Sequence, residues 1–359
     1  MSFSTPRLIL AFLITRYFAY KVNNNEDNLK LRDRVIHILD IWTSITSFQF
    51  DENMIESLEM FSTFLNDEEK NINHSSQVTA IIQKIKGNIK HEEKIQLPEC
   101  PEPIINMNLP EDEWTLQNVH PLELARQVTL LHYSIFKQIE PNELLDDIWG
   151  DKKSRASVNI DHLVEHFTMF SSYVSLSIIT GETAKVRGKV FKNWIDVAKQ
   201  FLDLNNFHGV FSVILGLTHR SVSRMSNTMK YAMKTNSKRK KEYEKMLNIC
   251  NISNDFQNYR SIITTAKEPC IPFIGCYQKD LIYVQETFPN KVNGLINFRK
   301  CQECYKLVKT IQDFQRIGYN FMEVPKIQKL LEYLPEPTDS IDLMKLSMAK
   351  EKKEKEKKK

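Results

Sequence analysis

The sequence predicts an all-α fold, in which a helical N-terminal accessory domain packs on a larger α-helical domain with a protruding helical hairpin. Composition is the first observation behind this prediction. The 359 residues include only 9 Gly and 13 Pro and are rich in Leu, Ile, Lys, Glu and Met, which favours helices over sheets. Periodicity is the second, because apolar residues recur at helical spacing through most of the chain. Strand signals are confined to short runs such as residues 281–284.

Residues 1–66 are expected to form the accessory domain. Three amphipathic helices follow one another there; the first begins near Pro6 and the third is capped by Asp51. Residues 67–113 are predicted to be a linker, because polar stretches alternate with LPECPEPIINMNLPEDEW, whose prolines favour extended backbone.

Residues 114–336 are expected to form the larger domain, since long amphipathic stretches follow in close order there. These stretches cover residues 121–140, 160–180, 187–204 and 295–316. Residues 337–359 form a charged C-terminal tail, which ends in a run of Lys and Glu without an apolar residue. We expect a solvated end, and the alternative is weak attraction to an anionic membrane surface.

The larger domain is organised around residues 203–273. Residues 207–217 are apolar almost all round, which a helix tolerates only when protein surrounds it on most sides. Residues 230–245, KYAMKTNSKRKKEYEK, are so charged that little of them can be core. We therefore predict that the buried helix leads into a long, projecting, charged helical segment and forms the rigid base that holds it.

No pattern for covalent chemistry is present. The chain lacks a Gly-rich phosphate loop, a nucleophile elbow and an HExxH zinc helix. Cys301 and Cys304 form a single CxxC inside an amphipathic helix, and His162 and His166 lie one turn apart without a third ligand nearby. Helix packing explains both pairs better than a metal does. We expect no metal, no cofactor and no enzymatic chemistry.

Net charge, cysteine content and hydropathy indicate where the protein acts and which partners it lacks. A net charge of +4 is too small to predict a nucleic-acid binder, and six Cys without a framework spacing favour a reducing compartment. Residues 8–19 are apolar but are interrupted by Arg16 and are shorter than a membrane span needs, and no signal-cleavage site follows. We expect a cytoplasmic protein, with recruitment to the inner face of the plasma membrane as an open alternative.

Three residues suggest a contact surface. Arg126 lies on the flank of a helix whose stripe must face the core, so its guanidinium could bind a partner's carboxylate or form an internal salt bridge. Met225 and Met229 lie one turn apart and make an apolar facet on a polar segment. This facet is either core or an adaptable contact surface.

Five motifs occur in a fixed order between about residues 116 and 335: HPLELARQVTLLHYSIFKQIEPNELL, LNNFHGV with VSRMSNT, NDFQNYR, PCIPFIGCYQKDL and NGLINFRK. In this order they resemble the catalytic domain of Ras-type guanine-nucleotide exchange factors (RasGEFs). FSTPRLILAFLITRYFAY and LRDRVIHILDIWTSITSFQFD resemble the second half of the Ras exchanger motif domain that precedes it. We therefore expect a shortened accessory domain of this type.

The resemblance implies an exchange factor that accelerates GDP release from a Ras-family GTPase, which it would bind in the GDP-bound and nucleotide-free states. The resemblance places the hairpin at roughly residues 222–260, braced on the core by residues 269–273. The hairpin would displace switch I and block the end of the nucleotide site that holds Mg²⁺ and phosphate. The implied GTPase-binding residues are Leu122, Arg126, Thr168, Met169, Met225, Met229 and Lys230. The implied hairpin-support residues are Asn205, Asn206, Phe207, Pro269, Cys270, Pro272 and Phe273.

The chain departs from the family pattern at several of these positions. Thr168 or Met169 stands where an Asn is common, Met229 replaces an aromatic, and Lys230 replaces an acid that contacts the partner in some members. Met225 stands where the wedge residue is usually Leu. These departures keep a second hypothesis open, that the chain is a weakly active GTPase-binding module or a helical signalling scaffold.

Overall fold

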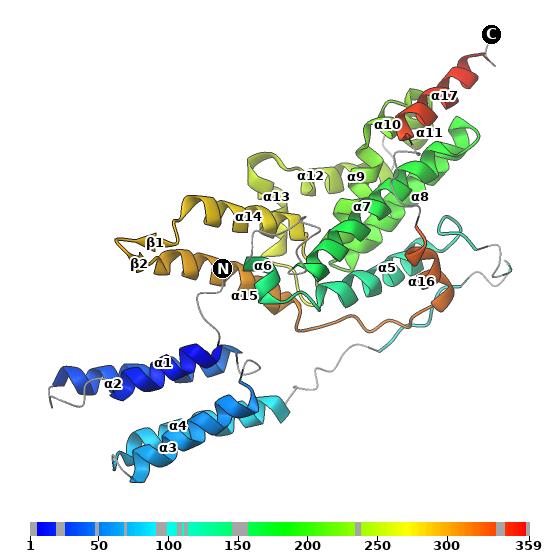
Figure 1. Ribbon diagram of the computed structural model, residues 1–359. Helices are drawn as coiled ribbons and strands as arrows, with labels where there is room; N and C mark the ends of the chain where they lie inside the picture. The colour runs from blue at the N-terminus through cyan, green and yellow to red at the C-terminus, as the bar shows by residue number, and fades with distance from the viewer. Residues whose placement is uncertain are drawn as a thin grey trace. The chain divides into compact units, whose positions relative to one another are not determined.

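A computed structural model describes residues 6–18, 26–46, 50–67, 70–90, 99–105, 110, 114–145, 157–233, 238–334 and 342–356. The chain divides into two compact units, Met1–Gln96 and Leu97–Lys359. Apart from two strands of two residues each, the regular elements among the described residues are helices (Figure 1), which confirms the all-α prediction. None of these helices is long and apolar enough to cross a membrane.

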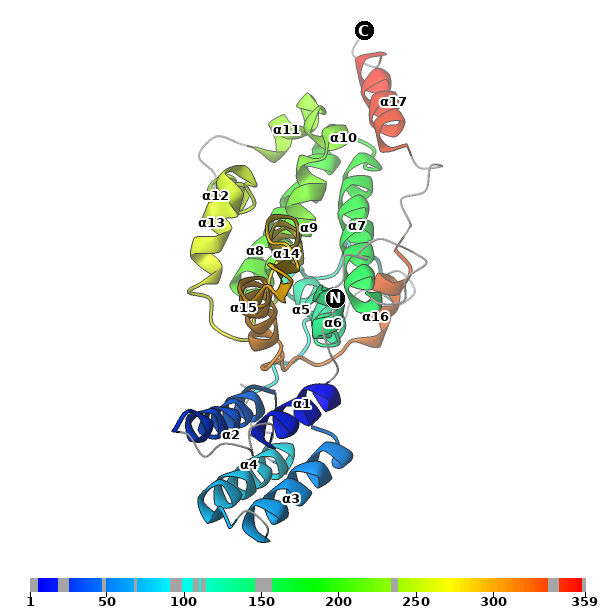
Figure 2. The same ribbon diagram turned by 60° about the vertical axis from the view of Figure 1, so that its left-hand side comes forward.

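The first unit contains four described helices: α1 (Pro6–Phe18), α2 (Glu26–Thr46), α3 (Glu52–Asp67) and α4 (Ile72–Lys90). Figure 2 shows α1 beside α2 and α3 beside α4, and side chains of all four form one apolar core. The predicted cap is confirmed, because the Met54 N–H donates to the Asp51 carboxylate at 2.9 Å.

Helix α4 corrects the predicted linker. Residues 72–90 lie inside the stretch expected to be extended, yet they form a helix that packs on α2 and α3. The physical reason is a stripe of apolar residues at helical spacing, Val78, Ile81, Ile82 and Ile85, all of which are buried. Polar residues of this helix such as Asn73, Lys84 and Lys86 are exposed.

The second unit is built around α9 (Phe207–Thr218), which confirms the prediction of a buried central helix. It packs against α5 (Pro121–Phe136), α7 (Val158–Ile179), α8 (Ala184–Asp203) and α12 (Lys238–Ile249). Residue Leu215 is the large apolar side chain of α9 that reaches solvent. The unit also contains shorter helices: α6 (Pro141–Leu145), α10 (Arg220–Ser223), α11 (Ser226–Ala232), α13 (Ser253–Ile263) and α16 (Pro325–Glu332).

Residues 222–260 do not form the predicted projecting hairpin. Helices α10 to α12 pack on α7, α8 and α9, and Val222, Met225, Tyr243 and Met246 are buried in the same core as α9. The charge of α12 lies on its outer face alone. A charged sequence therefore covers one side of this helix without making it project.

The helical hairpin of this unit is formed by α14 (Ile274–Thr287) and α15 (Phe298–Phe314). The two helices pack side by side and are joined by the antiparallel strands β1 (Lys291–Val292) and β2 (Leu295–Ile296), with these strands at the end away from α9 (Figure 1). Asn293 and Gly294 make the turn with φ of 53° and 78°, the left-handed conformation that a tight Asn-Gly turn requires. All six residues from 291 to 296 are exposed.

Helix α17 (Leu343–Glu356) corrects the predicted solvated tail in its first half. It packs on α7 and α10, and Ser347 is buried, donating to the Ser221 carbonyl at 2.6 Å and accepting from Arg224 at 3.1 Å. The predicted tail therefore begins with an anchored helix.

Candidate functional site

The base of the α14–α15 hairpin is joined to α9 through main-chain hydrogen bonds. The Phe207 N–H donates to the Ile271 carbonyl at 2.9 Å, and the Ile271 N–H donates to the Asn205 carbonyl at 3.0 Å. Asn205 adopts a φ of 55°, which Asn tolerates better than most residues. Asn206 caps α9, with its side-chain oxygen accepting from the Gly209 N–H at 2.8 Å. These contacts fix where the chain enters α14.

Aromatic packing reinforces this junction. The Phe273 ring lies parallel to the Phe211 ring with centroids 3.9 Å apart, and the Phe273 N–H donates to the buried Tyr259 hydroxyl at 2.8 Å. The Arg260 guanidinium forms a two-point ion pair with Asp280 of α14 at 2.8 and 2.7 Å. The predicted support residues Asn205, Asn206, Phe207, Pro269, Cys270, Pro272 and Phe273 therefore lie on the two segments that meet here, and they position α14–α15 instead of residues 222–260.

One face of α14 is open to solvent. Ile282 and Tyr283 are 43% and 65% exposed, and Glu286, one turn after Ile282, is also exposed. On the opposite face Tyr277, Leu281 and Val284 are buried. The hairpin therefore presents apolar side chains and a carboxylate on a helix whose base is fixed.

The prediction of the site missed this face of α14. The signal was the Asn293-Gly294 dipeptide between two amphipathic stretches, which is a strong local indication of a reversal. Two helical stretches on either side of such a turn predict an antiparallel pair.

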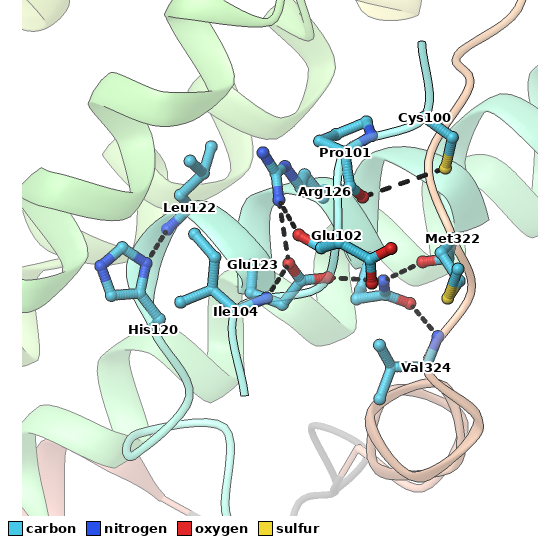
Figure 3. A network of polar contacts seen from close by, with 11 residues as sticks. Cys100, Pro101, Glu102, Ile104, His120, Leu122, Glu123, Arg126, Met322 and Val324 are labelled. Atoms are coloured by element: carbon cyan, nitrogen blue, oxygen red, sulfur yellow. Dashed lines mark hydrogen bonds and ion pairs between the residues drawn. The ribbon is translucent and has the colours of Figure 1, made fainter. Parts of the chain in front are cut away.

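Arg126 lies in an internal polar network (Figure 3). Its guanidinium donates to the Glu123 carboxylate and to the Glu102 carbonyl, both at 3.2 Å. The Arg126 side chain is 12% exposed and that of Glu123 is 1% exposed. The same carboxylate accepts from the Ile104 N–H at 3.0 Å and from the Gln127 amide at 2.8 Å. Of the two alternatives left open for Arg126, the internal salt bridge is the one observed.

The structure separates the other predicted GTPase-binding residues by exposure. Thr168 and Lys230 are exposed, and Leu122, Met169 and Met229 are half-buried. Met169 and Met229 also pack against the main core. Met225 is fully buried, so its predicted role as a wedge residue is wrong in this structure. The apolar Met225–Met229 facet faces largely inward because α11 packs on α8.

Three buried histidines, His132, His166 and His208, lie close to the hairpin junction, where the His208 and Phe273 ring centroids are 6.2 Å apart. His132 Nε2 and His166 Nδ1 are 3.0 Å apart, and the His132 and His208 ring centroids are 5.1 Å apart. Burial lowers the pKa of His166 to about 4 and that of His208 to about 3. Burial and the neighbouring His166 and His208 also lower the pKa of His132. The cluster is therefore neutral at physiological pH.

Comparison with known proteins agrees with the motifs. The RasGEF domain model matches residues 123–302, which is half of the chain. The chain is 28% identical to Ras guanine nucleotide exchange factor J of Dictyostelium discoideum, over 92% of this chain and 42% of that protein. It is 26% identical to exchange factor A of the same organism, over 92% of this chain and 55% of that protein.

A relative from an animal shows the same similarity. The chain is 29% identical to the protein son of sevenless of Drosophila melanogaster, over 84% of this chain and 19% of that protein. Across these three relatives the chain spans between 19% and 55% of their length. The domain match, with the motif order and the helical fold, shows that this chain belongs to the RasGEF family.

Proposed function

We propose that the chain accelerates GDP release from a Ras-family small GTPase and that α14–α15 is the hairpin that acts on the nucleotide site. The observation that carries the proposal is the combination of a fixed base and an open face. The base is held by main-chain hydrogen bonds and by the Arg260–Asp280 ion pair. The open face carries Ile282 and Tyr283.

The chemistry of this face suits the proposed action. GDP is held largely by Mg²⁺ and by contacts to its phosphates, so a hairpin that enters this region must weaken both. An apolar side chain such as Ile282 would occupy the space of the ion without coordinating it. The Glu286 carboxylate would repel the phosphates by like charge, an effect that is strong where water is excluded. No covalent step is required.

The proposal is tested by mixing the protein with Ras-family GTPases loaded with a fluorescent GDP analogue, in the presence of excess unlabelled GDP. Substoichiometric protein should accelerate the fluorescence decay on at least one GTPase. A matched reaction with an Ile282→Asp variant should not. Decay at the intrinsic rate across the panel would contradict exchange activity.

The alternative function, a GTPase-binding module or scaffold, predicts a different pair of results. Pull-down of a nucleotide-free GTPase would succeed while the GDP decay stayed at its intrinsic rate. Residues Met229 and Lys230, which depart from the family pattern, are the positions to exchange first in that case.

A further inference from the structure

The charged segment that does not form the hairpin still needs an explanation. Helix α12 packs beside α8, where Tyr243 and Phe191 pack edge to face with ring centroids 5.6 Å apart. Between the outer faces of the two helices runs a groove of about 500 Å³. We call it the basic groove; its charged lining residues are Lys192, Asp196, Lys199, Lys238, Arg239 and Glu242.

Lysines extend the groove along both helices. On α8, Lys185 and Lys189 precede Lys192 at intervals of four and three residues, so all three lie along one face. On α12, Lys241 and Lys245 follow Lys238. Among the described residues, none of these six lysines forms an ion pair.

The acids in the groove are largely committed to other partners. Asp196 accepts from Nε and Nη2 of Arg239, both at 2.8 Å, and Asp203, at the end of α8, is paired with Lys199. Glu242 is the remaining carboxylate of the lining. The surface that is left carries a clear excess of positive charge.

We propose that the basic groove binds the anionic surface of a membrane. Its free cations are lysines, which act as flexible point charges and suit headgroup phosphates that move laterally. The fixed carboxylates of a partner protein would be bound best by the two-point hydrogen bonding of an arginine guanidinium. The guanidinium of Arg239, the arginine of the lining, already donates from Nε and Nη2 to Asp196. The chain's net charge of +4 is too small to favour a nucleic-acid partner.

An apolar anchor lies beside the lysines. Tyr231 of α11 is 48% exposed, and a Cβ atom placed on Gly188 of α8 would lie 2.6 Å from the Tyr231 Cβ. Tyr231 is therefore next to the α8 backbone between Lys185 and Lys192. Val186, one residue after Lys185, is 43% exposed. Amphipathic aromatic rings beside basic residues favour the boundary between headgroups and acyl chains.

The proposal does not depend on exchange activity, so it is tested on the full chain without a GTPase. Sedimentation is measured with vesicles of phosphatidylcholine alone and of phosphatidylcholine mixed with phosphatidylserine. We expect salt-sensitive binding to the mixed vesicles. The triple variant Lys189→Gln, Lys192→Gln, Lys238→Gln should bind them about 100-fold more weakly, since each cation near an anionic surface contributes about fivefold.

A matched control removes the same charge elsewhere on the second unit. The triple variant Lys137→Gln, Lys267→Gln, Lys329→Gln alters three lysines on other elements and should bind within about threefold of the parent protein, which is the scale of a screened, distant charge. Tyr231→Ser should weaken binding at both low and high salt, because it removes an apolar contact and no charge.

Three outcomes would overturn the proposal. Equal losses in the two triple variants would make the effect one of net charge. Loss of binding on deleting residues 351–359, with no loss in the groove triple, would assign the contact to the lysine-rich end. A groove triple that binds vesicles normally but no longer binds a nucleotide-free GTPase would place a protein partner on this face. Circular dichroism melts of each variant confirm that it is folded.

Discussion

Two regions of the second unit, residues 222–260 and the α14–α15 hairpin, differ in how their polar and apolar residues are used. The first is the more highly charged, yet Met225, Tyr243 and Met246 hold it against α8 and α9. The second is less conspicuous in sequence, yet Ile282 and Tyr283 remain exposed on it. The charged residues of a helix show which of its faces meets water. Whether the helix projects from the domain depends on how extensively its apolar face packs against other helices.

The largest expected effect is that of a substitution at Met225, which tests whether residues 222–260 are part of the core. Because this side chain is fully buried, Met225→Asp should lower the free energy of unfolding by about 3–5 kcal/mol, the cost of an uncompensated buried charge. Urea denaturation measures the loss, and Met225→Leu serves as the conservative control. A Met225→Asp protein of normal stability that fails only in exchange would restore Met225 as a wedge.

The reciprocal change on the hairpin should affect activity and leave stability intact. Ile282→Asp should slow GDP release about 100-fold, a loss of about 2.7 kcal/mol in transition-state stabilisation. Its free energy of unfolding should change by less than about 0.5 kcal/mol, as expected for a surface substitution.

The same substitution at Ile252, which is 69% exposed and lies within residues 222–260, is the matched control. Ile252→Asp should change neither exchange nor stability. If Ile252→Asp slowed exchange and Ile282→Asp did not, the hairpin would have to be placed where the sequence first suggested it.

Arg126 extends the comparison to α5. Arg126→Met removes the cation from the buried Glu123 carboxylate and should cost about 2 kcal/mol of stability, somewhat less than a fully buried pair because Arg126 retains some solvent contact. Thermal unfolding checks this, and adding Glu123→Gln should recover part of the loss. An unchanged melting temperature with impaired GTPase binding would instead make Arg126 a partner contact.

Acid should act on the hairpin junction through the three histidines. Their pKa values are lowered in the folded protein, so the unfolded chain binds protons first as the pH falls below about 6.5. The stability they contribute is complete above that pH and declines toward pH 4, by about 1.4 kcal/mol per pH unit for each histidine.

Urea midpoints between pH 7.5 and 5 measure this slope. His166→Leu should flatten it by about a third, since one of three proton-binding groups is removed. The His208 and Phe273 ring centroids lie 6.2 Å apart, so protonation of the cluster would disturb packing at the base of α14. A slope that is unchanged in the variant would exclude the cluster as its cause.

Much of the architecture could be predicted from local patterns. The buried α9 and the cap at Asp51 follow from side chains whose packing needs are evident in sequence. The support residues in LNNF and PCIPF are expected from the family resemblance instead. The position of the hairpin could not be predicted from charge, because α12 hides an apolar stripe of Tyr243, Met246 and Ile249 beneath its lysines. Likewise the buried stripe of α4, which is Val78, Ile81, Ile82 and Ile85, was obscured by flanking Asn and Lys.

The site was predicted in part for a related reason. Asn206 and Phe207 belong to a motif that the family resemblance identifies, so their role at the junction could be anticipated even though their partners Thr129 and Ile271 are distant in sequence. The setting of Arg126 depends on the segment around Glu102 and Ile104, which reaches it through a polar stretch with no periodicity. Contacts of that kind depend on tertiary structure that no local pattern records.

The junction between residues 205–207 and Ile271 is formed by main-chain hydrogen bonds, which join peptide groups. Peptide groups are the same in every residue except proline, so substitutions on the outer face of α14 leave the junction chemically unchanged. The outer face of α14 and the junction at its base can therefore evolve independently. Substitutions on that face could adapt the hairpin to a different GTPase while the orientation of α14 stays the same.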